Sequence, residues 1–252
     1  MVYIYDGSFI GFLSAVHAVY YDGTSHVEAI VTEEERGGLF SEEKEVPTES
    51  EKAWTVAAAF EQKCGRAAAQ WLYRAFLAEE PRREEVLYTY LREGFKAGAD
   101  IYRRRMEPWV WTVFSWAKKT GREAGTFLGL VRFRELESGL LYGEISPTHD
   151  ILPLLGQHFK KRFPQKEWAI CDARRRHALY CREGQLLLAD LAGTVELVYS
   201  VDEKELQALW RTYYRHMAIP ERFHPLLRRS FMPEKYWTYL TEMEEEKPGV
   251  IQ

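Results

Sequence analysis

The chain has 252 residues, 46% of them hydrophobic, which is enough to bury a full core in one large domain. Its three cysteines are widely spaced and form no CxxC pair, which argues against a secreted disulfide framework and a structural zinc site. The N-terminus lacks the basic segment of a signal peptide, and the longest apolar stretch is shorter than the roughly twenty residues of a membrane-spanning helix. We therefore expect a cytoplasmic protein with no membrane segment, metal or cofactor.

The formal net charge of −4 conceals an uneven distribution. Residues 28–51 contain nine Glu against Arg36 and Lys44, a local charge of −7. Residues 158–182 contain eight Lys or Arg against two acidic residues, a local charge of +6. A basic segment attracts phosphate groups even in an acidic chain, although both segments are equally compatible with ordinary solvated surface.

The first half of the chain predicts a strand followed mainly by helices. "VYIY" at residues 2–5 indicates a strand, and a helix follows after a turn capped by Asp6 or Ser8. Residues 22–48 favour short strands and exposed loop. Residues 49–125 are rich in Ala, Leu, Glu and Arg and predict three or four helices, with a break near Gly65 and a new helix with Pro108 in its first turn.

The pattern changes after residue 126, where short apolar segments bounded by turn residues predict strands. These segments are "TFLGLVRFREL", "GLLYGEIS", "EWAICDA", "RHALYC" and "QLLLADL". A helix with Asp150 as its N-cap and Pro153 in its first turn lies between the second and the third. We expect an α+β fold with a mostly antiparallel sheet over about residues 126–190, one inserted helix, and N-terminal and C-terminal helices covering it. Residues 1–252 would form a single domain, helical over about 49–125 and sheet-bearing over about 126–252.

One stretch, "EISPTHDILPLLGQHFKKRFP", suggests a catalytic site. His149 would stand at the start of a helix, where its imidazole stays neutral and accepts a proton, and His158 lies beside the apolar stripe of that helix. Glu144 or Asp172 on neighbouring strands would orient His149. Arg132 would bind a phosphate or carboxylate ligand, or pair with Glu144. The alternative is that these residues are a cap, a turn and a helix boundary. The spacing matches no zinc signature, and no nucleophile elbow, phosphate loop or dinucleotide fingerprint is present.

Two clusters of basic residues suggest nucleic-acid binding. They are Lys160, Lys161, Arg162, Arg174, Arg175 and Arg176 in the first cluster and Arg211, Arg215, Arg222, Arg228 and Arg229 in the second. Aromatic residues are interleaved with the second cluster, and guanidinium groups beside aromatic rings are typical of sequence-tolerant single-strand binding. An amphipathic helix with arginines on its wet side would show the same pattern.

Five stretches in order along the chain resemble one bacterial family. They are "DGSFIGFLSAV", "REAGTFLGLVRF", "ISPTHDILPLLGQHFKKRFP", "WAICDARRRHALY" and "LWRTYYRHMAIPERFHPLLRRSFMPEKYWTYLTE". The family is a domain of unknown function assigned to DNA metabolism. It also occurs fused to uracil-DNA glycosylase-like domains and is encoded beside a radical SAM protein of DNA modification or repair. The resemblance implies a DNA-linked role and a radical SAM or uracil-DNA glycosylase-like partner. It implies no catalytic residue.

One motif departs from the family pattern, because Gly125 and Thr126 stand where the family typically has His and Arg after Glu-Ala.

The first functional hypothesis is a DNA-metabolism accessory protein that binds nucleic acid through its basic surface and works with a radical SAM or uracil-DNA glycosylase-like partner. The acidic segment would dock a basic partner or shield the DNA-binding surface. The second hypothesis is an enzyme acting on a nucleotide or damaged base, with His149, His158, Asp172, Glu144 and Arg132 gathered at one end of the sheet. The third is a protein-interaction scaffold that binds no DNA.

Overall fold

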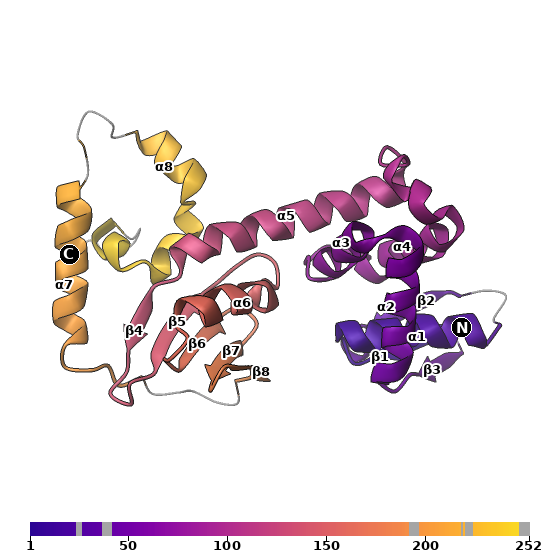
Figure 1. Ribbon diagram of the computed structural model, residues 1–252, viewed down its shortest axis with the longest axis horizontal. Coiled ribbons are helices and arrows are strands. Elements are labelled where there is room, and N and C mark those ends of the chain that lie inside the picture. Colours follow the sequence, from indigo (N-terminus) through magenta and orange to yellow (C-terminus); the bar gives the residue numbers. More distant parts are fainter. Residues whose placement is uncertain (24–26, 37–41, 192–196, 218, 220–223, 247–252) are drawn as a thin grey trace. The chain divides into compact units, whose positions relative to one another are not determined.

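The computed structural model describes residues 1–23, 27–36, 42–191, 197–217, 219 and 224–246 (Figure 1). The chain divides into two compact units, an N-terminal unit of residues 1–120 and a C-terminal unit of residues 121–252. Helices and two sheets build them, which confirms the α+β prediction. That residues 1–252 form a single domain stays a prediction. None of the helices in the described ranges has the length and apolar character needed to cross a membrane.

The N-terminal unit contains a three-stranded sheet in the order β2–β1–β3, with both pairs parallel. The strands are β1 (Val2–Tyr5), β2 (Ala29–Thr32) and β3 (Glu43–Glu45). Tyr3, Ile4 and Tyr5 are almost fully buried, as expected of a central parallel strand, whereas the edge strand β3 is charged. The strand at residues 2–5 is confirmed, but its parallel pairing was not predicted.

Four helices of this unit follow local sequence signals. They are α1 (Phe9–Tyr21), α2 (Ser50–Cys64), α3 (Arg66–Phe76) and α4 (Arg83–Ala97), with short 3-10 helices at Glu33–Glu35 (η1) and Gly98–Tyr102 (η2). The side chain of Ser8 caps α1 by accepting a hydrogen bond from the N–H of Gly11. Gly65 separates α2 from α3 with a φ of +88°, a conformation that side-chain-bearing residues rarely adopt. The predicted cap and the predicted break are both confirmed.

Helix α5 (Pro108–Leu130) contains the boundary between the two units. Its start at Pro108 was predicted, but the segment "TFLGL" after residue 126 is helical, and the prediction of a strand there was wrong. Ala124, Phe127 and Val131 are buried at spacings of three and four residues, so the core of the C-terminal unit selects helical periodicity at this point. The strand begins only at Phe133.

The C-terminal unit contains a five-stranded sheet in the order β4–β5–β6–β7–β8. Its strands are β4 (Phe133–Glu135), β5 (Leu141–Ile145), β6 (Trp168–Asp172), β7 (His177–Arg182) and β8 (Gln185–Asp190). The β5–β6 pair is parallel and the other neighbours in this order are antiparallel, and helix α6 (Leu152–Arg162) joins β5 to β6. The predicted, mostly antiparallel sheet with one inserted helix is therefore confirmed.

The core of this unit lies between the sheet, α6 and the last turns of α5. Leu152, Leu155 and Phe159 of α6 are almost fully buried. Gly156 lets α6 approach the sheet closely, because a Cβ atom there would lie 2.9 Å from Leu186. The prediction of Asp150 as N-cap was wrong, because the helix begins after Ile151 without a side-chain cap.

The C-terminal elements are mostly short helices. They are α7 (Glu203–Met217), α8 (Pro225–Phe231) and two 3-10 helices, η4 (Glu234–Tyr239) and η5 (Thr241–Glu246). Tyr236 of η4 packs edge-on against Phe127 of α5 and joins the core. Large apolar side chains of α7 and α8 remain exposed, including Leu209, Tyr213 and Phe231.

All three cysteines are buried and free. Cys64 belongs to the N-terminal unit, and its thiol donates to the carbonyl of Gly94. Cys171 and Cys181 lie on β6 and β7 of the C-terminal unit. Burial raises the pKa of the Cys64 and Cys171 thiols, so both are inert at neutral pH.

Candidate functional site

The loop of residues 146–151 joins β5 to α6 at the carboxyl ends of the parallel strands β5 and β6. In proteins with parallel strands, ligands commonly bind at the carboxyl ends of these strands, where loops converge and the next helix begins. The loop includes His149, one of the predicted catalytic residues. We therefore take this loop as the first candidate region.

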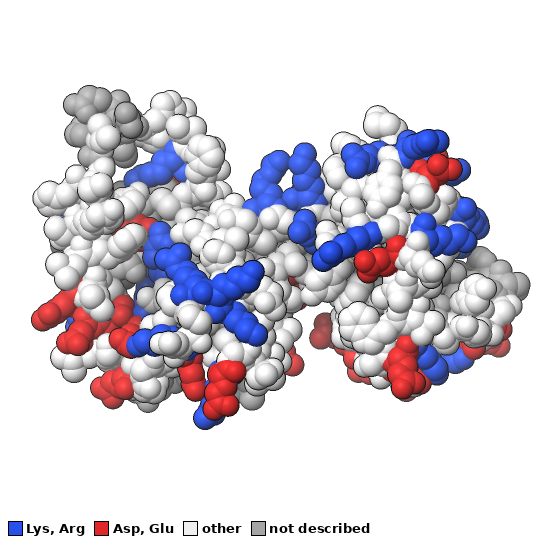
Figure 2. Space-filling view, in the orientation of Figure 1, with Lys and Arg blue, Asp and Glu red and all other residues white. Residues whose placement is uncertain are grey.

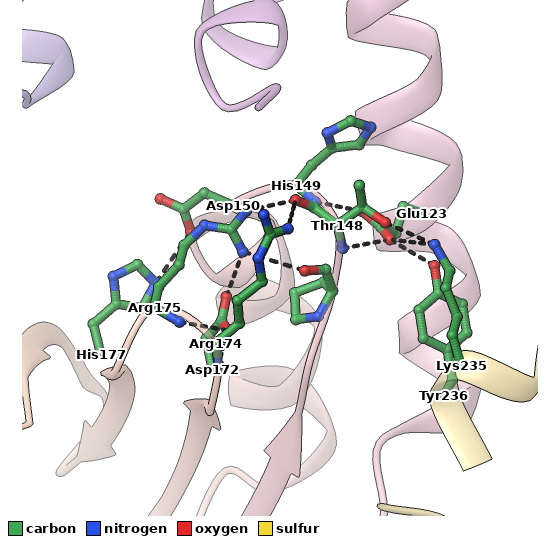
Figure 3. A network of polar contacts seen from close by, with 11 residues as sticks. Glu123, Thr148, His149, Asp150, Asp172, Arg174, Arg175, His177, Lys235 and Tyr236 are labelled. Carbon is green, nitrogen blue, oxygen red and sulfur yellow. Dashed lines mark hydrogen bonds and ion pairs between the residues drawn. The ribbon is translucent and has the colours of Figure 1, made fainter. Parts of the chain in front are cut away.

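A buried carboxylate on α5 holds one side of the loop (Figure 3). Glu123 accepts hydrogen bonds from the backbone N–H groups of Thr148 and His149, both at 2.8 Å, and from the Tyr236 hydroxyl at 2.6 Å. Burial alone would raise the pKa of Glu123, but these hydrogen bonds outweigh burial and place the pKa below its ordinary value of 4.5. Glu123 is thus an ionised acceptor that fixes the loop.

The end of β6 holds the other side of the loop. The fully buried carboxylate of Asp172 accepts from the backbone N–H groups of Arg174 and Arg175 and from the Arg175 guanidinium at 2.8 Å. Both arginine side chains then donate to the carbonyl of Thr148, and Arg175 also donates to that of Pro147 (Figure 3). Asp172, Arg174 and Arg175 together form a bracket that shapes the loop, a role that sequence reasoning did not assign to them.

His177, at the start of β7, faces the same loop. Its Nε2 atom lies 3.3 Å from Oδ1 of Asp150. The interaction with Asp150 raises the pKa of His177 above its ordinary value of 6.5, although burial opposes the shift. Sequence reasoning missed this pair, because its members are 27 positions apart in the chain.

The stability of the C-terminal unit is expected to fall as the pH rises from 6.5 through the raised pKa of His177. A raised pKa in the folded state means that the protonated His177–Asp150 pair stabilises the fold fully below pH 6.5, and that this stabilisation is lost as the pH rises through the raised pKa. Urea unfolding followed by circular dichroism across this range measures the effect. His177→Gln should remove this component of the pH dependence, and an unchanged slope in the variant would contradict the assignment.

The five predicted catalytic residues do not meet in one cavity. Glu144 pairs in register with Cys171, the neighbour of Asp172, so Glu144 and Asp172 point to opposite faces of the sheet. The imidazole of His149 points away from Asp172 (Figure 3). His158 lies on the exposed side of α6.

Arg132, the fifth of these residues, lies in a different network. Its guanidinium forms a forked pair with the buried carboxylate of Glu242 at 2.6 and 3.1 Å, and not with Glu144. Trp210 of α7 donates its indole N–H to the same carboxylate at 2.9 Å. Burial alone would raise the pKa of Glu242, but the hydrogen bonds and charge of Arg132 outweigh burial and lower the pKa. The two carboxylate oxygens are both bonded.

This network borders a pocket of about 380 Å³, which we call the α7 pocket. The pocket lies between the last turn of α5, the last turn of α6 and the first two turns of α7. Polar groups reach it from Arg132, Arg162, Glu203 and Gln207, and aromatic walls come from Phe133, Phe159, Phe163 and Trp210. Sequence reasoning named Arg132 and Arg162 but missed Gln207, Trp210 and Glu242, although Gln207 and Trp210 are three residues apart and thus share a helix face.

The first basic cluster does not form one surface. Lys160, Lys161 and Arg162 end α6, and the side chain of Lys160 passes close to Gly184 in the turn between β7 and β8. Arg174 and Arg175 bond to the loop at the other end of α6. Arg176 precedes β7 at this same end, in a left-handed conformation with a φ of +56°. An 11-residue helix, roughly 16 Å long, separates the two groups.

The second basic cluster is partly engaged within the fold. Arg228 lies over the Trp237 ring at 4.9 Å, and Arg229 pairs with Glu234 at 2.7 Å. Arg211 and Arg215 lie one and two turns after Gln207, along the same stripe of α7. Arg222 lies outside the described residues. Within the same described ranges, no group of three or more His, Cys, Asp or Glu side chains is placed to hold a metal ion.

Comparison with known proteins identifies a family. A family model described as a domain of unknown function, DUF4130, matches residues 81–242. The matched range includes the bracketed loop and the lining of the α7 pocket, and it leaves β1 to α3 outside. No curated protein and no solved structure gives a significant match to the chain.

Proposed function

The chain belongs to the DUF4130 family, a domain of unknown function, and we propose that its C-terminal unit binds nucleic acid through the basic end of α6. The role would be that of an accessory protein in DNA metabolism or repair. The resemblance of five ordered stretches to a family linked to DNA metabolism supports this assignment. It also supports a radical SAM or uracil-DNA glycosylase-like protein as the partner.

The observation that carries the proposal is the cation triplet of α6, which we define as Lys160, Lys161 and Arg162. In the described parts of the chain, no acidic side chain forms an ion pair with any of the three. Other cations near this end of the sheet are paired, Lys166 with Glu135 at 3.0 Å and Arg182 with Glu167 at 3.2 Å. The triplet therefore keeps its charge available for phosphate groups.

In Figure 2, Lys and Arg side chains gather over the part of the C-terminal unit where Figure 1 draws α6. Three cations at a helix C-terminus also favour the helix itself, because they compensate its dipole. The absence of acidic partners around the triplet, among the residues that the structure describes, favours the binding role.

An exposed apolar face favours the accompanying role with a protein partner. Leu209, Tyr213 and Met217 recur every four residues along α7 and are 65%, 55% and 62% exposed. Exposed apolar residues that cluster in this way commonly mark protein interaction sites. A scaffold without nucleic-acid affinity would use the same face, and the DNA titration described next distinguishes the two roles. The separation of Glu144, His158 and Arg132 disfavours the enzyme hypothesis.

Reversing the charge of the triplet with the substitutions K160E, K161E and R162E is expected to weaken binding of a short single-stranded DNA by about a hundredfold. The slope of log K against log salt should become shallower by about 2, because three phosphate contacts at roughly 0.7 counterions each are lost. Fluorescence anisotropy at several salt concentrations measures both quantities.

Replacing Arg103, Arg104 and Arg105 by Glu is the matched control, because it changes the charge equally on another exposed surface. Arg103 and Arg104 already lie near Asp100 and Glu107, at 3.6 and 3.7 Å. The control should bind DNA nearly as well as the unaltered protein. Equal losses in the two triple variants, or none in the α6 variant, would exclude the triplet as the binding surface.

A further inference from the structure

The α7 pocket lies beside the cation triplet, because Arg162 belongs to both. We propose that this pocket receives one unstacked base of a single-stranded DNA, with the adjoining phosphate against Arg162. The inference rests on the proposed function and deepens it, because it assigns a base-binding site to a surface so far argued only from charge.

The walls of the pocket suit a flat aromatic ligand. Phe163 follows the last turn of α6 and Trp210 lies on α7, and each ring has a guanidinium over it. Arg162 lies 5.7 Å from the Phe163 centroid, and Arg132 lies 5.4 Å from the Trp210 centroid. Aromatic rings and guanidinium planes are the groups on which proteins stack unpaired bases. A purely apolar ligand could form no hydrogen bond with these guanidinium groups.

Arg162 is the group in the pocket lining against which the phosphate of the ligand would lie. Glu203 accepts from the N–H of Glu135 at 2.9 Å and from the amide of Gln207 at 2.7 Å, so each of its oxygens has a donor. The Glu242 carboxylate is neutralised by Arg132. Arg162 has no carboxylate partner in the described ranges, and its charge therefore remains for the ligand.

The pocket also offers a hydrogen-bonding group for the edge of a base. The amide nitrogen of Gln207 is engaged with Glu203, which fixes the amide and leaves its oxygen as an acceptor. A volume of about 380 Å³ lies in the range of small-ligand sites and is large enough for one base. In a stacked strand the neighbouring bases cover the faces of a base, so a base that contacts the aromatic walls of the pocket leaves its stack, as in other proteins that bind extruded bases.

Gly129 of α5 allows a direct test, because it lines the pocket and a Cβ atom there would meet no heavy atom within 4 Å. Gly129→Phe therefore places a large side chain at the wall of the pocket without a backbone clash. Gly125→Phe is the matched control, because a Cβ atom at Gly125 also meets open space but the residue does not line the pocket. Circular dichroism and urea unfolding check both variants, and Gly129→Leu replaces the Phe variant if that variant does not fold.

The measurement is fluorescence anisotropy with a fluorescein-labelled single strand, the same strand with abasic residues, and its duplex. The unaltered protein should bind the complete single strand about tenfold more tightly than the abasic strand or the duplex. Gly129→Phe should lose this preference while keeping the salt-dependent binding, and Gly125→Phe should keep both. Free deoxynucleoside monophosphates, titrated by calorimetry, test whether the ligand is a free nucleotide.

The outcomes separate the inference from the proposed function. If Gly129→Phe binds the complete strand as tightly as the unaltered protein, the base site is wrong, whereas the triplet still binds the backbone. If free monophosphates bind and Gly129→Phe abolishes only their binding, the pocket serves free nucleotides and the strand assignment is overturned. If no oligonucleotide binds at low salt, both proposals fail.

Discussion

Replacing Arg132 by Met is expected to lower the free energy of unfolding of the C-terminal unit by about 3–5 kcal/mol. The Glu242 side chain is only 1% exposed, and Arg132 supplies both its counter-charge and a forked pair of hydrogen bonds. Without the guanidinium, a buried carboxylate keeps only the indole N–H of Trp210 as a side-chain donor. Urea unfolding at neutral pH, followed by tryptophan fluorescence, measures the change.

Two controls test this prediction, a double variant that also replaces Glu242 and a variant of the exposed Arg82–Glu85 ion pair. The double variant Arg132→Met, Glu242→Leu removes both charges and should recover most of the loss, because no buried charge is left alone. Arg82 and Glu85 form a similar fork at 2.6 and 2.7 Å but are 76% and 59% exposed. Arg82→Met should therefore change the stability by less than about 1 kcal/mol. A double variant as unstable as Arg132→Met would show that lost packing, and not the lone charge, causes the effect.

Replacing Glu123 by Ala is expected to destabilise the C-terminal unit by about 2–4 kcal/mol. Three donors lose their acceptor at once, two of them backbone N–H groups of the loop and the third the buried hydroxyl of Tyr236. Chemical denaturation measures the stability. Amide hydrogen exchange should in addition show faster exchange at Thr148 and His149 than elsewhere in the unit.

Glu137→Ala is the control for this prediction, because Glu137 is exposed and lies in the turn between β4 and β5 of the same unit. Its effect should stay within about 0.5 kcal/mol. Protection of the loop amides that survives in Glu123→Ala would mean that the arginine bracket alone holds the loop.

Local signals in the sequence identified the elements whose ends depend on one residue. Gly65 breaks a helical pair because it adopts a positive φ, and Pro108 starts α5 because a proline is tolerated in the first turn. The segment "TFLGL" failed for the opposite reason. Its short apolar run fits a strand or a helix equally well, and packing of Phe127 and Val131 on the core decides for the helix.

The candidate site was less accessible to sequence reasoning, because its contacts join distant positions. That Arg132 needs a carboxylate partner follows from its apolar surroundings, but the choice of Glu242 among 38 acidic residues depends on the fold. Lys160 and Arg175 are close in sequence and were assigned to one surface. The helix between the two groups places them at opposite ends of the sheet.

The three buried thiols described above allow the opening of each unit to be measured separately by the rate at which its cysteines are labelled. An alkylating reagent reaches a buried sulfur only when the structure around it opens, so the rate of labelling reports the free energy of that opening. The labelling rate of Cys64 reports the opening of the N-terminal unit, and the rates of Cys171 and Cys181 report the opening of the C-terminal unit. One common opening free energy would indicate a single cooperative domain. Two different values would indicate two units that open independently on either side of the boundary within α5.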